Sequence, residues 1–358
     1  MTTKINNEHN ILNVPNLRFP EFEGEWETYK IQDVLRIGNG RDYKHLGTGD
    51  IPVFGTGGYM TSVTDYLYDG ETTFIGRKGT INKPYYYKGK FWTVDTLFYT
   101  HSFNGVTPHF VYCLFQTINW LRYNEASGVP SLSKDTIEKI KLHIPQIEEQ
   151  QKISKLLSLL DERITTQNKI IDKLQSLIKG LRVRLIQIEN GNIVHLGEIA
   201  RIYQPQTISS TELTEDGFLV YGANGIIGKY KEYNHKTEQI CITCRGNTCG
   251  MVNYTKPMSW ITGNAMVINT DEHQNKVCKR YLYHYLSAYN FNSLISGSGQ
   301  PQIVRTPLEQ LKVTLPTFLE QKQKATFLDK IQGKIEISNK TLNLYLQQKQ
   351  YLVRQMFI

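Results

Sequence analysis

The chain has 358 residues, with 41 Lys and Arg against 33 Asp and Glu, a formal net charge of +8 and a sequence pI near 9.0. Its length is typical of two or three domains, and its 40% of hydrophobic residues excludes a wholly disordered chain. No apolar run approaches the ~20 residues of a membrane span, the N-terminal segment lacks the apolar stretch of a secretory signal, and five cysteines indicate a reducing compartment, so we expect a cytoplasmic protein.

The first part of the chain, about residues 26–145, has the pattern of a mixed domain. Short β-like runs such as TTFIG (72–76) and FWTV (91–94) lie between turns rich in Gly, Thr and Asn. The segment PHFVYCLFQTINWLR (108–122) places apolar side chains at helical spacing. We therefore expect an α+β unit.

A long helix is predicted to follow. Its core positions, apolar except for Gln167, alternate spacings of four and three residues, which is the heptad pattern of a coiled coil. The positions are Ile153, Leu157, Leu160, Ile164, Gln167, Ile171, Leu174, Ile178, Leu181 and Leu185. A helix of this extent would be roughly 55–60 Å long, which is more than one small domain can cover. The seam therefore predicts a second helix as its partner.

The remainder of the chain repeats the first part. The segment IPQIEEQQKIS (144–154) returns as LPTFLEQKQKA (315–325), and SGVP (127–130) returns as SGQP (298–301), both 171 positions later. Further upstream, VFGTGG (53–58) returns as VYGANG (220–225). Because these matches keep their order, we interpret the chain as a duplication. The second globular part again has β-like runs, QICITC (239–244) and MVINT (266–270), and a helical pattern at 279–291.

The second half also ends in a heptad helix of the same phase. Its core positions include Leu328, Ile331, Ile335, Leu342, Tyr345 and Leu352. Only the short segment QIENGN (187–192) separates the first helix from the second globular part, which favours antiparallel packing of the two helices and a pseudo-twofold repeat. The predicted domains are 1–148, the first globular domain; 149–190, a central helix; 191–319, the second globular domain; and 320–358, a C-terminal helix.

Catalytic signatures are absent from the sequence. It contains no G-x-x-x-x-G-K, G-x-G-x-x-G, H-E-x-x-H or G-x-S-x-G pattern, nor the Asn/Asp-Pro-Pro-Tyr of an amino-methyltransferase. Cys241, Cys244 and Cys249 lack the second pair of ligands that a zinc site needs. The positions equivalent to the first two are Phe74 and Arg77 in the first half, so we expect no metal and interpret these cysteines as small core residues.

Each half carries a Gly-rich turn followed by a basic turn. In the first half GTGGYM (55–60) precedes GRKGTINKP (76–84), and in the second YGANGIIGKY (221–230) precedes CRGNTCG (244–250). Gly allows close approach of backbone N–H groups to phosphate, and Arg, Asn and Gln can read base edges. The net charge supports a polyanionic partner only weakly, and ordinary β-turns with solvated charges are the alternative. The predicted DNA contacts are Lys44, Thr56, Tyr59, Arg77, Lys78, Asn82, Lys83, Tyr221, Asn224, Lys229, Arg245 and Asn247.

Two further segments, SGVPSLSK (127–134) and SGSGQPQIVR (296–305), lie before the long helices. Each is either a loop near the DNA or the border of a domain.

The order of these features resembles a known family. A globular unit, S-G-x-P, then [IL]-P-x-x-x-E-Q and a heptad helix, all repeated once, is similar to the specificity (S) subunit of type I restriction–modification enzymes. The opening NVPNLRFPEFEGEW (13–26) is also similar to the start of such subunits.

The resemblance implies two target recognition domains that each read one half of a split double-stranded DNA target, with the paired helices setting the gap. It implies two modification (methyltransferase) subunits and restriction (motor-nuclease) subunits as partners. It also implies a chain without an active site or bound cofactor, because S-adenosylmethionine, ATP and Mg²⁺ belong to the partners. Two other functions stay open: a stand-alone nucleic-acid-binding scaffold, and an enzyme with an unrecognised site near Cys241.

Overall fold

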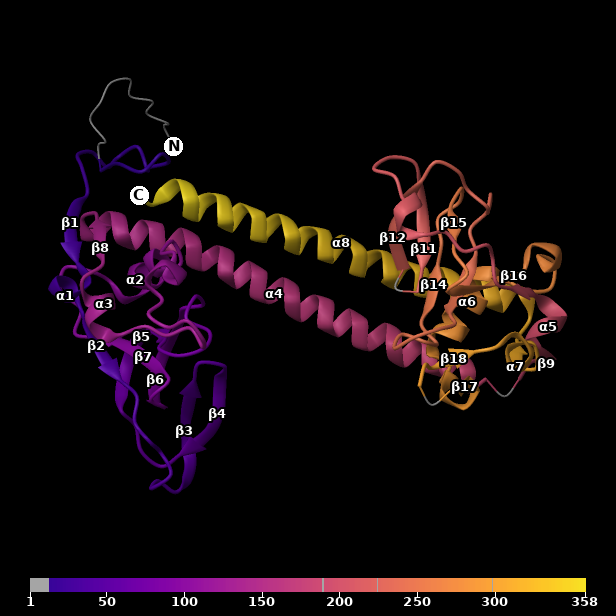
Figure 1. Ribbon diagram of the computed structural model, residues 1–358, viewed down its shortest axis with the longest axis horizontal. Helices are drawn as coiled ribbons and strands as arrows, with labels where there is room; N and C mark the ends of the chain where they lie inside the picture. The colour runs from indigo at the N-terminus through magenta and orange to yellow at the C-terminus, as the bar shows by residue number, and fades with distance from the viewer. Residues whose placement is uncertain (1–12, 189, 224, 298) are drawn as a thin grey trace. The chain divides into compact units, whose positions relative to one another are not determined.

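The computed structural model describes residues 13–188, 190–223, 225–297 and 299–358. The chain forms two compact units, one of Met1–Gln167 with Thr341–Ile358 and one of Asn168–Lys340. The expected fold class is confirmed: two α+β domains are joined by two long antiparallel helices, and the second half repeats the first (Figure 1). Within the described residues, no helix is long and apolar enough to cross a membrane.

The first recognition domain is built around a six-stranded sheet of order β2-β7-β5-β6-β3-β4, with β1 and β8 paired separately. Its elements are β1 (Glu27–Lys30), α1 (Ile31–Val34), β2 (Arg36–Asn39), β3 (Thr48–Gly55), β4 (Gly58–Val63), β5 (Tyr68–Gly76), β6 (Tyr85–Thr93), β7 (Leu97–His101), α2 (Pro108–Phe115), η1 (Trp120–Tyr123), α3 (Lys134–Glu138) and β8 (Lys141–Ile144).

The second recognition domain splits the same arrangement into a four-stranded sheet, β10-β16-β13-β14, and a three-stranded sheet, β12-β11-β15. Its elements are β9 (Asn192–His195), α5 (Leu196–Ile199), β10 (Arg201–Tyr203), η2 (Ser210–Glu212), β11 (Phe218–Gly222), β12 (Gly225–Tyr230), β13 (Ile240–Thr243), β14 (Val252–Tyr254), β15 (Trp260–Ile261), β16 (Ala265–Asn269), η3 (Asp271–His273), α6 (Lys279–Ala288), η4 (Phe291–Leu294), β17 (Ile295–Ser296), β18 (Gln302–Ile303), α7 (Arg305–Glu309) and β19 (Lys312–Leu315).

The repeat extends to strand register. Val53 pairs in parallel with Trp92, and Val220 pairs in parallel with Trp260. The hairpins β3–β4 and β11–β12 each carry an irregularity directly after this valine. The two repeated tryptophans therefore mark the same junction between a hairpin and the rest of its sheet.

The second domain interrupts the long strand of the first. Between β14 and β15 the chain contains Pro257, which has no backbone N–H to donate to a ladder, and Met258, whose φ is +51°. One continuous strand, β6, is therefore replaced by two short strands that belong to separate sheets.

Helix α2 is shorter than the pattern over 108–122 predicts. The helix ends at Phe115, whose carbonyl accepts a hydrogen bond from the Trp120 indole N–H at 2.9 Å. The Thr117 hydroxyl donates to the Leu114 carbonyl at 2.7 Å. These side chains satisfy terminal carbonyls that would otherwise require another helical turn.

The long helices α4 (Ile147–Ile186) and α8 (Phe318–Met356) contribute to both units. In the first unit, Asp161 near the start of α4 accepts a hydrogen bond from Lys349 near the end of α8 at 2.7 Å. In the second, Arg182 near the end of α4 donates to Gln332 in the first half of α8 at 3.4 Å. The helices therefore run in opposite directions (Figure 1).

The heptad positions face inward along both helices. Those that are buried are Ile153, Leu157, Leu160, Ile171, Ile178, Leu185, Leu328, Ile331, Ile335, Leu352 and Met356. Those that are half-buried are Ile164, Leu174, Leu181, Leu342 and Tyr345.

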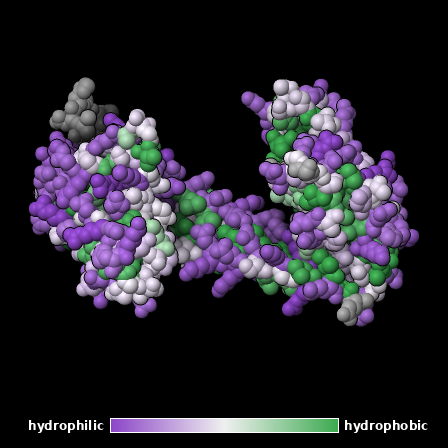
Figure 2. Space-filling model, turned by 60° about the horizontal axis from the view of Figure 1, so that its bottom comes forward, coloured by the Kyte–Doolittle hydropathy of each residue, from purple (hydrophilic) through white to green (hydrophobic). Residues whose placement is uncertain are grey.

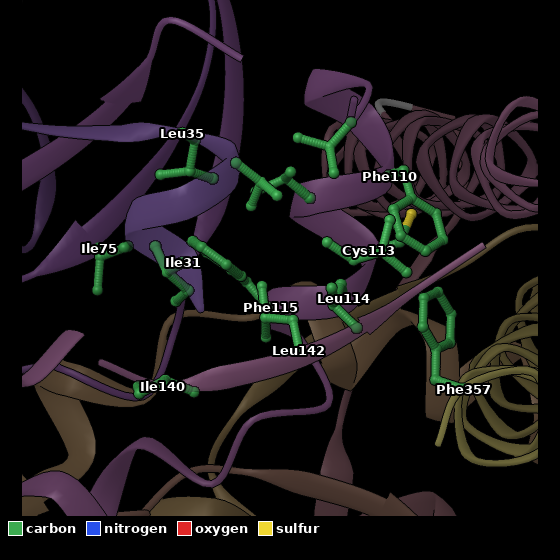
Figure 3. Packing of buried hydrophobic residues seen from close by; sticks show 14 of the residues in the cluster. Ile31, Leu35, Ile75, Phe110, Cys113, Leu114, Phe115, Ile140, Leu142 and Phe357 are labelled. Atoms are coloured by element: carbon green, nitrogen blue, oxygen red, sulfur yellow. The ribbon is translucent and has the colours of Figure 1, made fainter. Parts of the chain in front are cut away.

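The end of α8 also enters the core of the first domain. Phe357, directly after α8, stacks on Phe110 of α2 with ring centroids 5.5 Å apart (Figure 3). It also meets Trp26 edge to face at 6.2 Å. Burial of such a side chain contributes about 1.5–3 kcal/mol. The domain core and the helix seam are thus one continuous apolar cluster in this unit.

The glutamine of the repeated E-Q pair fixes the start of each long helix. The side chain of Gln150 is fully buried; its amide N–H groups donate to the carbonyls of Gly105 and Pro145, and its carbonyl accepts from Thr107 N–H, all at 2.9 Å.

Gln321 makes the same three contacts in the second unit. It donates to the carbonyls of Lys276 and Pro316 at 3.2 and 2.9 Å and accepts from Cys278 N–H at 2.9 Å. Each glutamine thus ties the start of a long helix to the entry of a domain helix, α2 or α6, which explains why the motif recurs.

Candidate nucleic-acid interface

The basic turn and the S-G-x-P loop of the first domain form one structure. Gly79 N–H donates to the Pro130 carbonyl at 2.8 Å, and Leu132 N–H donates to the Arg77 carbonyl at 2.9 Å. Lys78 pairs with Ser131 between these bonds. From the sequence these two segments were separate candidates for DNA contact, and in the fold they lie together.

The second domain repeats this arrangement bond for bond. Gly246 N–H donates to the Pro301 carbonyl, and Ile303 N–H donates to the Cys244 carbonyl, both at 3.0 Å. Arg245 pairs with Gln302. The basic residue that follows β5 or β13 is therefore presented from the same backbone frame in both domains.

A glycine is needed in both frames. Gly79 and Gly246 have φ values of +85° and +84°, a left-handed conformation that residues with a Cβ rarely adopt. This requirement accounts for the glycine directly after each basic residue.

The Gly-rich hairpin turn lies against the same end of the sheet. The Thr56 hydroxyl donates to the Thr96 carbonyl at 3.0 Å, and that carbonyl also accepts from Arg77 N–H at 2.8 Å. In the second domain the Thr243 hydroxyl donates to the Ala223 carbonyl. The hairpin turn, the basic turn and the S-G-x-P loop thus form one continuous face in each domain, here called the recognition face.

Several predicted contacts of the first domain are exposed on or near this face, namely Lys44, Tyr59, Lys78, Asn82 and Lys83. Arg77 is half-buried, because its guanidinium donates to the Asp95 carbonyl at 3.3 Å and lies over the Phe98 ring. Thr56 is half-buried, and its hydroxyl holds the turn as described above.

The loop that carries Lys44 packs beside the hairpin. Arg41 N–H donates to the Thr93 carbonyl at 2.8 Å, and the Trp92 indole N–H donates to the Arg41 carbonyl at 2.9 Å. The exposed side chain of Arg41 therefore joins the recognition face, although the sequence reasoning did not select it.

In the second domain Arg245 and Asn247 are exposed, and Lys229 forms an ion pair with Asp216 at 3.3 Å. Asn224 lies outside the described residues. Tyr221 corrects the prediction: it is buried, and its hydroxyl accepts from Lys256 N–H at 3.1 Å. Burial raises the pKa of Tyr221, and its ring belongs to a core cluster that includes Cys241 and Ile261.

Two pairs of apolar residues lie next to the hairpin turns, and of these the sequence reasoning selected Tyr59 but missed Met60, Ile226 and Ile227. Tyr59 and Met60 follow the first turn, and Ile226 and Ile227 follow the second at equivalent positions; all four are exposed. Their matching place in the repeat was the available signal.

The cysteines of the second domain do not form a reactive site. Cys241 and Cys244 are fully buried, and burial raises the pKa of Cys241 to about 12, so its thiol stays protonated near neutral pH. Among the described residues, no group of three or more His, Cys, Asp and Glu side chains is arranged to hold a metal ion.

Comparison with known proteins agrees with this geometry. The family model of the type I restriction modification DNA specificity domain matches the chain twice, at residues 23–176 and 189–346. The MjaVIII type I restriction enzyme specificity subunit of Methanocaldococcus jannaschii is 24% identical over 93% of this chain and 91% of its own length.

Solved structures share the fold. The S subunit of a type I restriction–modification system from M. genitalium superposes with a TM-score of 0.76 at 16% identity, over 96% of this chain and 99% of that one. A chain from a study of complex assembly and conformational transition of the type I R-M system superposes with a TM-score of 0.53 at 14% identity, over 93% and 97%. We conclude that the chain belongs to the family of type I restriction–modification DNA specificity proteins, as the order of its motifs predicted, and that it carries two target recognition domains.

Proposed function

We propose that the two recognition faces each read one half of a bipartite double-stranded DNA target. The observation that carries this proposal is the repeated backbone frame, in which the turn of Gly79 and the turn of Gly246 clasp the S-G-x-P loop through the same hydrogen bonds. Equivalent frames that present Lys78 in one domain and Arg245 in the other are what two readers of different base sequences require.

The residues proposed to contact DNA are those of the recognition faces that are open to solvent. In the first domain they are Arg41, Lys44, Tyr59, Lys78, Asn82 and Lys83, with Arg77 at the edge, and in the second Lys229, Arg245 and Asn247. The proposed domain limits are those expected from the sequence, 1–148 and 191–319, with the helical segments 149–190 and 320–358 setting the separation of the half-targets.

We further propose that the chain acts without an active site of its own, in the cytoplasm, within a complex. Two modification (methyltransferase) subunits and the restriction (motor-nuclease) subunits would be its partners, and S-adenosylmethionine, ATP and Mg²⁺ would be bound by them. Family membership supports this assignment, as does the burial of Cys241 and Cys244, which keeps these thiols away from solvent.

The test compares the two half-targets. The methylated motif would be read from the host genome with the chain present and deleted, and binding of the assembled methyltransferase complex to duplexes with one altered half would then be measured. We expect Lys78→Ala to weaken recognition of one half and Arg245→Ala the other, each by about 1–3 kcal/mol if a base contact is lost.

A matched control is Lys155→Ala, which removes an exposed lysine of α4 away from the recognition faces. Equal losses at both halves from either variant would overturn the assignment of one domain to one half. Methylation by the chain without its modification subunits would overturn the proposal that it has no active site.

A further inference from the structure

The hairpin tip of each recognition domain exposes a pair of large apolar side chains. Tyr59 and Met60 are 64% and 51% exposed, and Ile226 and Ile227 are 56% and 45% exposed. Hydrophilic residues cover most of the visible surface of each unit, and hydrophobic residues reach it in small patches (Figure 2). An exposed apolar pair at the same place in both domains therefore calls for a ligand.

One member of each pair lies across a glycine. A Cβ on Gly55 would approach the Met60 sulfur to 2.7 Å, and a Cβ on Gly222 would approach the Ile227 Cδ1 to 3.1 Å. The missing side chain thus leaves space in which Met60 or Ile227 lies flat on the hairpin.

A second apolar group borders each glycine from the neighbouring strand end. The same Cβ positions lie 3.4 Å from a methyl of Val94 and 3.5 Å from the methyl of Thr262. Each tip is therefore a small apolar platform: the exposed Met60 beside the half-buried Val94 in the first domain, and the exposed Ile227 above the buried methyl of Thr262 in the second.

Cationic residues border the platform of the first domain. In the first domain, the Thr56 hydroxyl and the Arg77 N–H share the Thr96 carbonyl, which places the hairpin turn next to the basic turn. The loop that begins at Gly40 and carries Arg41 and Lys44 lies against the same edge. Gly40 packs so closely on the Val94 carbonyl that a Cβ would not fit there. A polyanion fits this setting better than a neutral protein surface.

We propose that these apolar platforms read thymine by contact with its C5-methyl group in the major groove. A two-stranded β-ribbon fits that groove, and the thymine methyl is the apolar group that base edges present there. The proposal rests on the proposed DNA recognition and adds specificity-determining residues to it. Because Tyr59–Met60 and Ile226–Ile227 differ in shape, each platform selects a different position of thymine.

The test removes only the methyl group. The chain assembled with its modification subunits would be titrated with the duplex target read from the host methylome, and with duplexes in which each thymine in turn is replaced by deoxyuridine. In the wild type we expect one replacement in each half to lower affinity roughly fourfold, the effect of one buried methyl-sized group. Ile226→Ala with Ile227→Ala should lower affinity for the thymine duplex and abolish the difference in the second half only, and Met60→Ala should do so in the first.

The matched control is Ile193→Ala, which truncates an isoleucine of the second unit that is 68% exposed on β9, outside the hairpin. Its affinity and thymine preference should equal those of the wild type, and thermal melting would show that every variant is folded.

Three results would overturn the proposal: equal affinity of the wild type for thymine and deoxyuridine duplexes, a half-target that contains no thymine, or folded hairpin variants that no longer assemble with the modification subunits. In the last case the tip would be a protein-docking surface. Arg245→Ala distinguishes these failures from failure of the proposed function, since it would still impair the second half-target if only the platform assignment is wrong.

Discussion

The two recognition domains share their backbone frame and differ in their side chains. Gln150 and Gln321 make the same three hydrogen bonds, and Gly79 and Gly246 adopt the same left-handed conformation. The basic turn presents Lys78 in one domain and Arg245 in the other. The residues kept in the repeat are therefore those that hydrogen-bond to backbone groups or allow a turn, whereas exposed residues on the same backbone frame vary.

The side chains that join each domain to the long helices also differ between the two units. In the second unit His284 is fully buried, accepts at Nδ1 from Arg182 at 3.1 Å and contacts Asp329 through Nε2 at 2.8 Å. Positions 171 earlier hold Cys113 in place of His284 and Ser158 in place of Asp329. An ionic network therefore occupies the place where the first unit has a buried thiol.

A network of charges continues around Asp329. Arg280 donates to both of its carboxylate oxygens, and the Arg280 guanidinium lies 4.2 Å from the Tyr254 ring centroid. In the first unit the ion pair of Lys349 and Asp161 instead joins the two long helices to each other. The packing of domain and helices is thus stabilised by different side chains in the two halves. Three experiments would test how far the two units are equivalent.

The largest effect is expected from the shared glutamine. Gln150→Ala or Gln321→Ala would leave one buried carbonyl, that of Pro145 or Pro316, together with a second carbonyl and one N–H without their partner, at a cost of about 3 kcal/mol in the free energy of unfolding of that unit. Amide hydrogen exchange resolved by unit would measure it, with the exposed neighbours Gln151→Ala and Gln323→Ala as controls. A unit that tolerates its substitution would show that the repeated bonds are not equivalent in energy.

A smaller and asymmetric effect is expected from the glutamate before each glutamine. Glu149 is buried and accepts two hydrogen bonds from Arg18, at 2.8 and 2.7 Å, so Glu149→Gln should destabilise the first unit by about 2 kcal/mol. Glu320 is exposed and accepts from the N–H and hydroxyl of Thr317, so Glu320→Gln should cost less. Chemical denaturation of the two variants would compare them, and equal losses would contradict the difference in burial.

The smallest effect is expected from acidification, and in α6 it should come from the network of His284. Burial lowers the pKa of His284 from its ordinary value of 6.5, although the hydrogen bond to Asp329 opposes this. The unfolded chain therefore binds the proton first, and the unit loses stability as pH falls through about 6.5. Burial would raise the pKa of Asp329, but hydrogen bonds from His284 and Arg280 lower it to about 2, so its contribution is lost only in stronger acid.

Hydrogen exchange of α6 between about pH 7.5 and 5.5 would measure this response. The His284→Gln variant is the control, since an amide has no proton to take up in this range. A wild-type response that persists in the variant would assign the effect to another group.

The sequence by itself determined the duplication, the heptad seam and the absence of the common catalytic motifs. Each rests on local spacing. Apolar residues at every third or fourth position of one helix predict which of its side chains are buried, as Leu157 and Leu328 illustrate. The glycine after each basic residue was likewise visible, because a left-handed turn demands it wherever the turn lies.

Only the tertiary structure decided which distant segments meet. It joined the turn of Arg77 to the loop of Pro130, placed Tyr221 in the core, and left Met60 and Ile227 exposed on the hairpins. Side chains alternate across a strand, so a shift of one residue in register reverses which of them reach the surface. That register depends on pairing between residues far apart in the chain, and local spacing therefore could not reveal the complete recognition faces.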